Sequence, residues 1–564
     1  MDYRKTVIDK LKEVDSIKDI DIESILEIPK DSSMGDFSFP CFRLASVFRK
    51  SPDAIANEIA AVIKTDLNIK KIEVVKGYLN FFINKSKMME ETFEKIFSLK
   101  ERYGFSYIGE KKNVIVEFSS PNIAKPFHIG HLCSTVIGNS LANIYEALGY
   151  HVIKVNHLGD WGTQFGKLMV AYENWGDDEK LKEEPIKELL RIYVKFHDEA
   201  EENPSLEEQA RYRFKLLEDG CEKETQLWEY FRTMSLKEFE KIYRRLNISF
   251  DSYAGEQFYS DKMPEVISLL EEKGLLVDSQ NAKVVNLDDY DMPPCLIVKS
   301  DGASIYATRD IAAAIYRVRN YHFDKNLYIV GTPQALHFKQ FFKVLELMGY
   351  PWSSDCRHIG FGLVKFKDKK LATRKGDVIN LEEVLDESVA RTLDIMKQSA
   401  SEVDDYTKTS EIVGIGAIIF TFLKKTRERD LIFSWEDTLN FEGETGPYVQ
   451  YSYSRAKSIL RKANFNENTP YDCDYLKEEV EIDLLSKLSK FGEMILEAAK
   501  RDEPSVIARY AVNISQTFNS FYNANRVIVE DKNVMNARLN LVYAFSIVIK
   551  NALALLGIEV VEIM

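Results

Sequence analysis

Two histidines stand three residues apart in a short segment that could bind an anion. The segment, SSPNIAKPFHIGHL at residues 119–132, carries His128 and His131 after two prolines and before a long helical pattern. Imidazoles at this spacing share one face of a helix's first turn, where both can donate N–H groups to phosphate oxygens and the helix dipole adds to the attraction. Capping and packing of a helix start explain the same residues equally well. A metal site fits less well, because no third ligand follows at a suitable spacing.

The surrounding pattern supplies the context that an anion site needs. It predicts a strand at residues 113–120, a helix from Phe127 to Leu148 and a second strand at 151–156. This is a βαβ unit of a parallel sheet, and such sheets bind ligands at the carboxyl ends of their strands, beside the N-terminus of the next helix. Gly130 leaves room there for a flat base. The pattern indicates a nucleotide site in which the imidazoles stabilise charge developing on an α-phosphate.

Length and composition indicate a large multidomain protein with reduced thiols, as in a cytoplasm. The 564 residues include 75 basic and 89 acidic side chains, and the net charge of −14 argues against non-specific adhesion to DNA or anionic membranes. The six cysteines form no C-x-x-C pair, so neither a disulfide framework nor a zinc knuckle is indicated. The N-terminus lacks the apolar core of a signal peptide, and the longest apolar stretch is interrupted by Lys550 and Asn551. We expect buried helices and no membrane segment, with a tail anchor as the minor alternative.

The chain is expected to divide into four parts. Residues 1–105 mix helical and strand-like patterns and should form a separate α+β module. Residues 106–380 should form a Rossmann-type domain whose parallel sheet is split by a charged helical insertion at about 170–290, with sheet strands resuming at PPCLIVKS and NLYIVG. Residues 381–430 are expected to form a helical connection and 431–564 an all-α C-terminal domain. The predicted fold class is therefore multidomain α/β plus α-helical.

The segments quoted above resemble a known family. VEFSSPNIAKPFHIGHL and VNHLGDWGTQFGKL look like the signature of class I aminoacyl-tRNA synthetases, and specifically of the arginyl-tRNA synthetase family. The similarity continues through SIYATRDIAAA, VGTPQALHFKQFF, HIGFGLV and TRKGDVINLEEVL to GPYVQYSYSRAKSIL, so that its landmarks cover most of residues 30–530. The resemblance implies ATP-dependent activation of L-arginine to arginyl-adenylate and its transfer to tRNA(Arg), with Mg²⁺ accompanying ATP and no structural metal. It also implies that activation waits for tRNA.

Binding a guanidinium requires carboxylates that accept paired hydrogen bonds. Glu117 ends the first predicted strand and Asp310 is expected at the start of a helix, so both should lie at carboxyl ends of strands. Each alone fits an ordinary role, as a surface charge or a helix cap. The resemblance implies an arginine pocket made of these two acids together with Asn122, His128, Tyr306 and Gln334.

A second loop is expected to supply cations to the ATP phosphates. By resemblance this loop is KKLATRKGD, in which Thr373 stands where the family signature usually has its second lysine. Lys125, just before the histidines, occupies a place where similar enzymes often carry a lysine that would bring a cation to the transition state from the other side. The alternative is that Lys125 is a solvated loop residue with no role in catalysis. The resemblance implies catalysis by Lys125, His128, His131 and Arg374, and ATP binding by Lys125, Gly130, His131, Lys370, Arg374 and Lys375.

Aromatic and basic residues alternate near the start of the C-terminal domain. Tyr448, Tyr451 and Arg455 lie in GPYVQYSYSRA, and such residues can stack unpaired bases and hold phosphates, although a stripe of tyrosines on a helix is more often core. The resemblance implies an anticodon-binding domain here and an N-terminal module that contacts the tRNA elbow. In that module a capped helix and a packed hairpin explain the same letters. The candidates there for tRNA contact are Asp36, Phe37 and Asn80.

Two other functions stay open at this point. A nucleotidyltransferase of the H-x-G-H type could act on a small acid without RNA, but the large helical C-terminal half argues against it. A synthetase-like RNA-binding protein with a decayed active site is favoured by the altered KKLATRKG loop and opposed by the intact acids and histidines. From the resemblance we expect a cytoplasmic monomer whose partners are tRNA(Arg), L-arginine and ATP.

Overall fold

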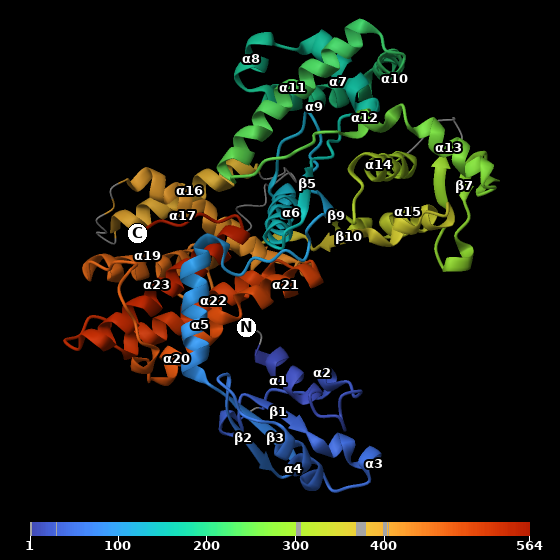
Figure 1. Cartoon of the computed structure of the whole chain (residues 1–564). Coiled ribbons are helices and arrows are strands. Elements are labelled where there is room, and N and C mark those ends of the chain that lie inside the picture. The colour runs from blue at the N-terminus through green and yellow to red at the C-terminus, as the bar shows by residue number, and fades with distance from the viewer. Residues whose placement is uncertain (1–2, 30, 300–305, 368–379, 399–402, 404) are drawn as a thin grey trace. The chain divides into compact units, whose positions relative to one another are not determined.

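The computed structural model describes the chain except residues 1–2, 30, 300–305, 368–379, 399–402 and 404 (Figure 1). The described residues divide into two compact units. The first contains residues 1–103, 459–490 and 516–548, and the second contains residues 104–458, 491–515 and 549–564.

The first unit begins with a small α+β module, as predicted. Its three-stranded antiparallel sheet has the order β1-β3-β2 and covers a core that includes Val7, Phe39, Ile59 and Phe81. The strands are β1 (Phe37–Pro40), β2 (Ile69–Val75) and β3 (Tyr78–Ile83). The helices are α1 (Tyr3–Lys12), α2 (Ile22–Ile25), α3 (Ala45–Phe48), α4 (Pro52–Val62) and α5 (Lys85–Leu99).

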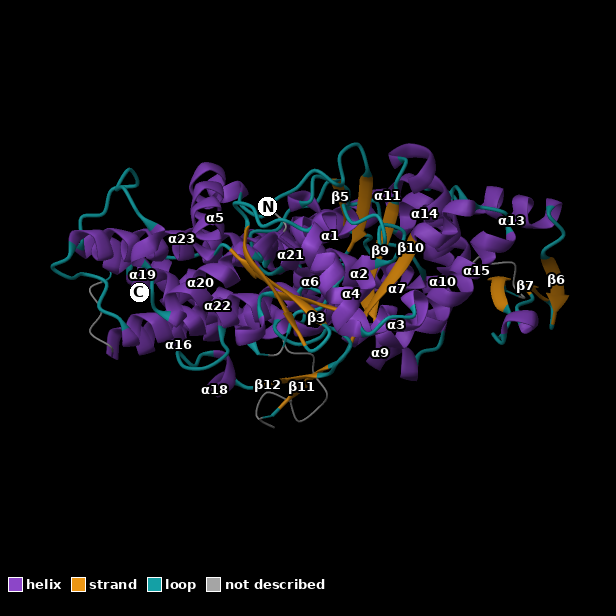
Figure 2. Cartoon of the chain, turned by 60° about the horizontal axis from the view of Figure 1, so that its bottom comes forward, coloured by secondary structure: helices purple, strands orange, loops and turns teal. Residues whose placement is uncertain are grey.

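The second unit contains a four-stranded parallel sheet of order β10-β9-β4-β5 (Figure 2). Strands β4 (Asn113–Glu117) and β5 (His151–Val155) flank helix α6 (Ile129–Ala147) in the sequence. Strands β9 (Lys325–Gly331) and β10 (Cys356–Phe361) similarly flank α15 (Ala335–Leu347). The two central strands, β4 and β9, pair directly although about 200 residues separate them, as expected for a sheet whose halves are split by an insertion. The predicted split Rossmann-type sheet is therefore confirmed.

Helices fill the insertion, as predicted, and Figure 1 shows α7 to α11 gathered together. The insertion ends in a second, antiparallel sheet of order β6-β7-β8. The helices are α7 (Thr163–Trp175), α8 (Asp178–Glu183), α9 (Pro185–Glu202), α10 (Ser205–Glu218), α11 (Glu222–Arg245), α12 (Glu256–Ser260) and α13 (Met263–Glu272). The strands are β6 (Leu276–Ser279), β7 (Ala282–Val285) and β8 (Cys295–Val298).

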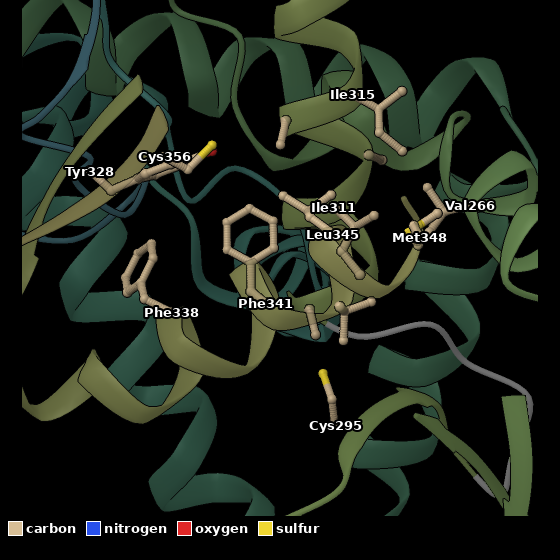
Figure 3. Packing of buried hydrophobic residues seen from close by; sticks show 14 of the residues in the cluster. Val266, Cys295, Ile311, Ile315, Tyr328, Phe338, Phe341, Leu345, Met348 and Cys356 are labelled. Atoms are coloured by element: carbon tan, nitrogen blue, oxygen red, sulfur yellow. The ribbon is translucent and has the colours of Figure 1, made fainter. Parts of the chain in front are cut away.

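The assignment of PPCLIVKS to the nucleotide-binding sheet was wrong. Its strand, β8, pairs with β7 in the antiparallel sheet instead. A short apolar run such as CLIV fits a strand of either sheet, because its periodicity does not reveal its neighbours. The next helix, α14 (Tyr306–Tyr321), packs with α15 around an apolar cluster that includes Ile311, Phe338 and Phe341 (Figure 3).

The C-terminal part is almost entirely helical, as predicted. An exception is the short strand β12 (Leu431–Phe433), which pairs in parallel with β11 (Val364–Phe366). The helices are α16 (Leu381–Gln398), α17 (Tyr406–Leu423), α18 (Trp435–Thr438), α19 (Gly446–Lys462), α20 (Glu479–Ser489), α21 (Phe491–Arg501), α22 (Ser505–Ala524) and α23 (Lys532–Leu555).

Helix α23 is long and apolar enough to cross a membrane by length and composition alone. However, 78% of its most apolar window is buried inside the protein. Such burial is typical of a core helix, because a membrane span would expose its apolar side chains to lipid.

Candidate active site

The two signature histidines build the start of α6. His128 is the N-cap residue, with an extended backbone, and its Nδ1 accepts the backbone N–H of Gly130 at 3.0 Å. The Nδ1 of His131 in turn accepts the backbone N–H of His128 at 3.1 Å. This reciprocal arrangement satisfies two free N–H groups of the helix end, as a capping box does. The helix begins at Ile129 and not at Phe127, so His128 precedes the first turn in which we expected it.

The histidine hydrogen bonds fix where each ring carries its proton. Since both Nδ1 atoms accept, the hydrogen of each neutral ring must be on Nε2. Burial lowers the pKa of His128, and burial together with the neighbouring His128 lowers the pKa of His131 to about 3. The ring centroids lie 3.7 Å apart. At neutral pH the cap therefore presents two uncharged Nε2–H donors.

Gly130 is needed because the His128 ring folds back over it. A Cβ atom at Gly130 would lie 2.8 Å from both Cε1 and Nδ1 of that ring. Any other residue would push the imidazole away from the N–H that it accepts. The structure thus gives Gly130 a role in the cap, and its contact with ATP stays a prediction.

The loop before the cap is held in an unusual backbone conformation. Ser119, Ser120 and Ala124 all have positive φ angles, of 71°, 48° and 61°, which non-glycine residues rarely adopt and which are often found at functional sites. The Ser120 N–H donates to Asn156 Oδ1 at 3.1 Å, and the Asn156 amide donates to the hydroxyl of Tyr243 in α11 at 2.9 Å. Asn156, a secondary candidate from the sequence without an assigned catalytic role, therefore helps to hold this loop.

Glu117 lies buried at the end of β4 and is already paired with an arginine of the chain. Arg317, in α14, is 0% exposed, and its Nη2 lies 2.5 Å from Glu117 Oε2. The sequence did not reveal this partner, because 200 positions separate the two residues. Two further nitrogens of Arg317, Nε and Nη1, have no hydrogen-bond partner among the described residues.

Asp310 pairs with a histidine that the sequence analysis did not single out. His337 Nε2 lies 2.6 Å from Asp310 Oδ2. Asp310 is the fifth residue of α14 and not its first, because that helix includes Tyr306. His337 stands in the quoted motif VGTPQALHFKQFF, so its position after a strand was the signal that could have found it.

The remaining predicted arginine-binding residues lie at loop and helix ends of the same unit. Tyr306 is 68% exposed at the beginning of α14. Gln334 is exposed at the end of the short turn of helix that follows β9. Asn122 is exposed and forms a backbone bridge with Gly159 in the loop after β5. Their contact with a ligand stays a prediction.

Two further acids, Asp160 and Glu256, share electrostatic interactions with Asp310, since the charges of Asp160 and Asp310 both act on Glu256. Asp160 is 2% exposed and accepts a hydrogen bond from Arg232 Nε at 3.0 Å. Glu256 forms an ion pair with Arg309 at 3.3 Å, and burial raises its pKa to about 7 against the opposing charge of that arginine. Asp160 is a secondary candidate from the sequence, without a catalytic role, and Glu256 was not singled out because it falls in the charged insertion, where a single acid gives no signal.

The predicted lysine loop can be located only through its ends. Lys370, Arg374 and Lys375 lie outside the described residues. Before the loop, the Lys367 N–H donates to Phe433 O at 3.1 Å. After it, the Leu381 N–H donates to Phe127 O at 2.9 Å. The chain therefore returns from this segment directly beside the histidine cap.

Lys125 is exposed in the loop that precedes the cap. Its positive charge lies near enough to His131 to contribute to the lowered pKa of that imidazole, after burial and His128. This places a cation within electrostatic reach of the two neutral donors. The position agrees with the predicted phosphate contact and does not test it.

The predicted anticodon residues lie on α19. The Arg455 guanidinium carbon is 4.9 Å from the centroid of the Tyr451 ring, which is 37% exposed. Tyr448 is half-buried on the same helix. Tyr453 is 5% exposed, so this member of the tyrosine stripe belongs to the core.

The N-terminal candidates have structural roles in the small sheet. The Asp36 carboxylate accepts the Ile83 N–H at 2.8 Å, and Phe37 is half-buried at the start of β1. Asn80 is 1% exposed and accepts a hydrogen bond from the Ser38 hydroxyl at 2.6 Å. Such burial favours the packed hairpin over direct tRNA contact by Asn80.

Comparison with known proteins decides the family. Residues 92–435 match "tRNA synthetases class I (R), catalytic domain", residues 1–83 match "Arginyl tRNA synthetase N terminal domain" and residues 449–564 match "DALR anticodon binding domain". The protein named "Arginine--tRNA ligase" of Clostridium botulinum (strain Loch Maree / Type A3) is 54% identical over 565 residues, with 100% of both chains covered. The chain belongs to the arginyl-tRNA synthetase family. Its relative in Clostridium acetobutylicum is likewise 54% identical, with 100% of both chains covered.

Solved structures of the family agree on the fold. The arginyl-tRNA synthetase of Thermus thermophilus matches with a TM-score of 0.82 at 24% identity over 100% of both chains. That of Plasmodium falciparum matches with a TM-score of 0.81 at 25% identity, covering 100% of this chain and 98% of the other. The predicted family and fold class are thereby confirmed, while the individual site residues remain predictions.

Proposed function

We propose that this protein is an arginine–tRNA ligase, which activates L-arginine with ATP to arginyl-adenylate and transfers the arginyl group to the 3′-terminal ribose of tRNA(Arg). The observation that carries the proposal is the pair of neutral Nε2–H donors at the start of α6, in the same unit as Glu117 and Asp310. Family membership and the names of the relatives support the same activity.

Arginine recognition is assigned to the acids of the second unit. A guanidinium forms its strongest contacts with carboxylates that accept two parallel hydrogen bonds. Glu117 and Asp310 provide the carboxylates. The proposed pocket is completed by Asn122, His128, Tyr306 and Gln334.

Activation requires charge stabilisation where the arginine carboxylate displaces pyrophosphate from the α-phosphorus. The Nε2–H groups of His128 and His131 donate to the phosphate oxygens beside the helix N-terminus, and neither ring acts as a nucleophile. Lys125 supplies a positive charge on the same side. Lys370, Arg374 and Lys375 complete ATP binding from the segment that ends beside Phe127.

Mg²⁺ accompanies the ATP phosphates in this proposal. Within the part of the chain that the structure describes, no group of three His, Cys, Asp or Glu residues is placed to hold a metal ion. The metal's ligands are therefore assigned mainly to the polyphosphate, as is common for Mg²⁺ in nucleotide enzymes.

The flanking regions are assigned to tRNA. Tyr448, Tyr451 and Arg455 would contact the anticodon loop, and Asp36 and Phe37 the tRNA elbow, while burial makes Asn80 a supporting residue. We keep the division into residues 1–105, 106–380, 381–430 and 431–564 for the elbow module, catalytic domain, helical connection and anticodon domain. We also propose that the protein is a cytoplasmic monomer and that it binds no membrane.

Arginine-dependent exchange of labelled pyrophosphate into ATP tests the proposal, measured with and without tRNA(Arg). We expect exchange and arginyl-tRNA formation in the presence of tRNA. Exchange with a different small acid and no RNA requirement would favour the small-acid nucleotidyltransferase. Absence of exchange under both conditions, with tRNA binding retained, would identify a homologue whose active site has decayed.

A further inference from the structure

Four acidic side chains of the second unit each have one basic partner. The pairs are Glu117 with Arg317, Asp160 with Arg232, Glu256 with Arg309 and Asp310 with His337. Three of the partners are arginines, which stay charged at any pH at which the protein is folded. Of these four acids, Asp310 alone has a partner that can be neutral.

Three of these acids share an electrostatic neighbour, His157. The charges of Glu117, Asp160 and Asp310 all reach the imidazole of His157, although burial keeps the pKa of that group below its usual value. Asp160 and Asp310 likewise act on Glu256. Asp310 thus differs from the other three acids in the type of its partner, which is an imidazole and not a guanidinium.

The hydrogen bond between His337 and Asp310 joins two helices that pack on one buried apolar cluster. Ile311 follows Asp310 in α14, and Phe338 follows His337 in α15; both side chains belong to one buried cluster (Figure 3). Phe338 also stacks on the ring of His358 at 4.4 Å between centroids. The bond uses Nε2 of His337 and Oδ2 of Asp310, so that, among the described residues, Oδ1 is the oxygen that remains for a ligand.

We propose that His337 is a positioning residue that fixes Asp310 as an acceptor for the guanidinium of arginine. This inference rests on the proposed function and adds a residue to its arginine pocket. The hydrogen bond to the imidazole fixes the direction of the Asp310 carboxylate, so that its other oxygen meets the guanidinium in a set geometry.

Arginine binding measured by calorimetry, together with steady-state aminoacylation, tests the role of His337. Loss of a hydrogen bond to a charged group should weaken arginine binding about tenfold or more in His337→Ala, with the same rise in KM and a change in kcat below about threefold. His337→Gln should recover most of the loss, because its amide keeps an N–H donor. Citrulline, which replaces the guanidinium by an uncharged urea group, should inhibit His337→Ala and wild type equally.

The control is Lys339→Ala, an exposed position on the same helix, which should bind arginine as wild type does. The inference is overturned if His337→Ala keeps wild-type arginine affinity, or if arginine and citrulline weaken by the same factor. If arginine affinity depends on His337 as expected but the wild type charges no tRNA, the positioning role stands and the ligase function fails.

Discussion

The imidazole of His131 accepts the backbone N–H of His128 at 3.1 Å, while the imidazole of His128 accepts the N–H of Gly130. The His131 ring thus holds the backbone of His128, and the backbone of Gly130 holds the His128 ring. The sequence H-x-G-H therefore encodes a helix cap as well as a pair of N–H donors. The structural interpretation of this motif, a helix cap, is therefore confirmed, while the phosphate contact stays a prediction with which the cap agrees, because capping through Nδ1 leaves Nε2–H as the donor.

The cap predicts a specific pH dependence of stability. His131 has a folded-state pKa of about 3, below its usual value, so its contribution is present above the unfolded pKa of about 6.5 and is lost as pH falls toward 3. At pH 5 the loss should be about 2 kcal/mol. His131→Gln, which does not titrate, should show a smaller fall in unfolding free energy between pH 7 and pH 5 than wild type, measured by urea denaturation. An equal fall in both proteins would contradict the buried neutral imidazole.

Gly130→Ala should damage the cap. The added Cβ would lie 2.8 Å from the His128 ring and displace it from the Gly130 N–H. We expect a fall of about tenfold to a hundredfold in the pyrophosphate-exchange rate, in line with the loss of one transition-state donor. Gly331→Ala is the matched control, since its Cβ would meet no atom closer than 3.6 Å and its φ of −56° suits alanine. Full activity of Gly130→Ala would show that the ring position is unimportant.

Arg317→Met should destabilise the protein more than a double variant does. Removing the buried guanidinium leaves the Glu117 carboxylate uncompensated, at a cost of about 3–5 kcal/mol. Adding Glu117→Gln removes that charge and should restore much of the stability, as measured by urea denaturation. If the losses of unfolding free energy caused by the two substitutions simply add in the double variant, Glu117 and Arg317 do not stabilise the protein as an ion pair.

Tyr451→Ala should weaken tRNA binding without affecting the small substrates. Loss of one base-stacking ring costs about 1–3 kcal/mol, so the KM for tRNA(Arg) should rise by about fivefold or more. The KM values for ATP and arginine should stay unchanged. Tyr212→Ala is the control, since that tyrosine is 63% exposed in the insertion. A parallel rise in the KM for ATP would instead indicate damage to the fold.

The sequence alone predicted the parts of the site that depend on local patterns of apolar residues, glycine and proline. Strand β4, helix α6 and strand β5 were expected within a few residues of their bounds, because apolar runs, Gly149 and the prolines mark them. The partners of the acids could not be predicted, since Arg317 and His337 reach Glu117 and Asp310 only through tertiary packing. Strand β8 was assigned to the wrong sheet for the same reason, because four apolar residues do not specify a neighbour.

The uncharged state of the two imidazoles affects the catalytic turnover rate through the release of pyrophosphate. With ATP in the proposed position, the fixed donors of the cap stabilise the pentacovalent phosphorus without binding the departing polyanion as strongly as two cations would. Release of pyrophosphate is then governed by the cations assigned to ATP binding and not by the cap.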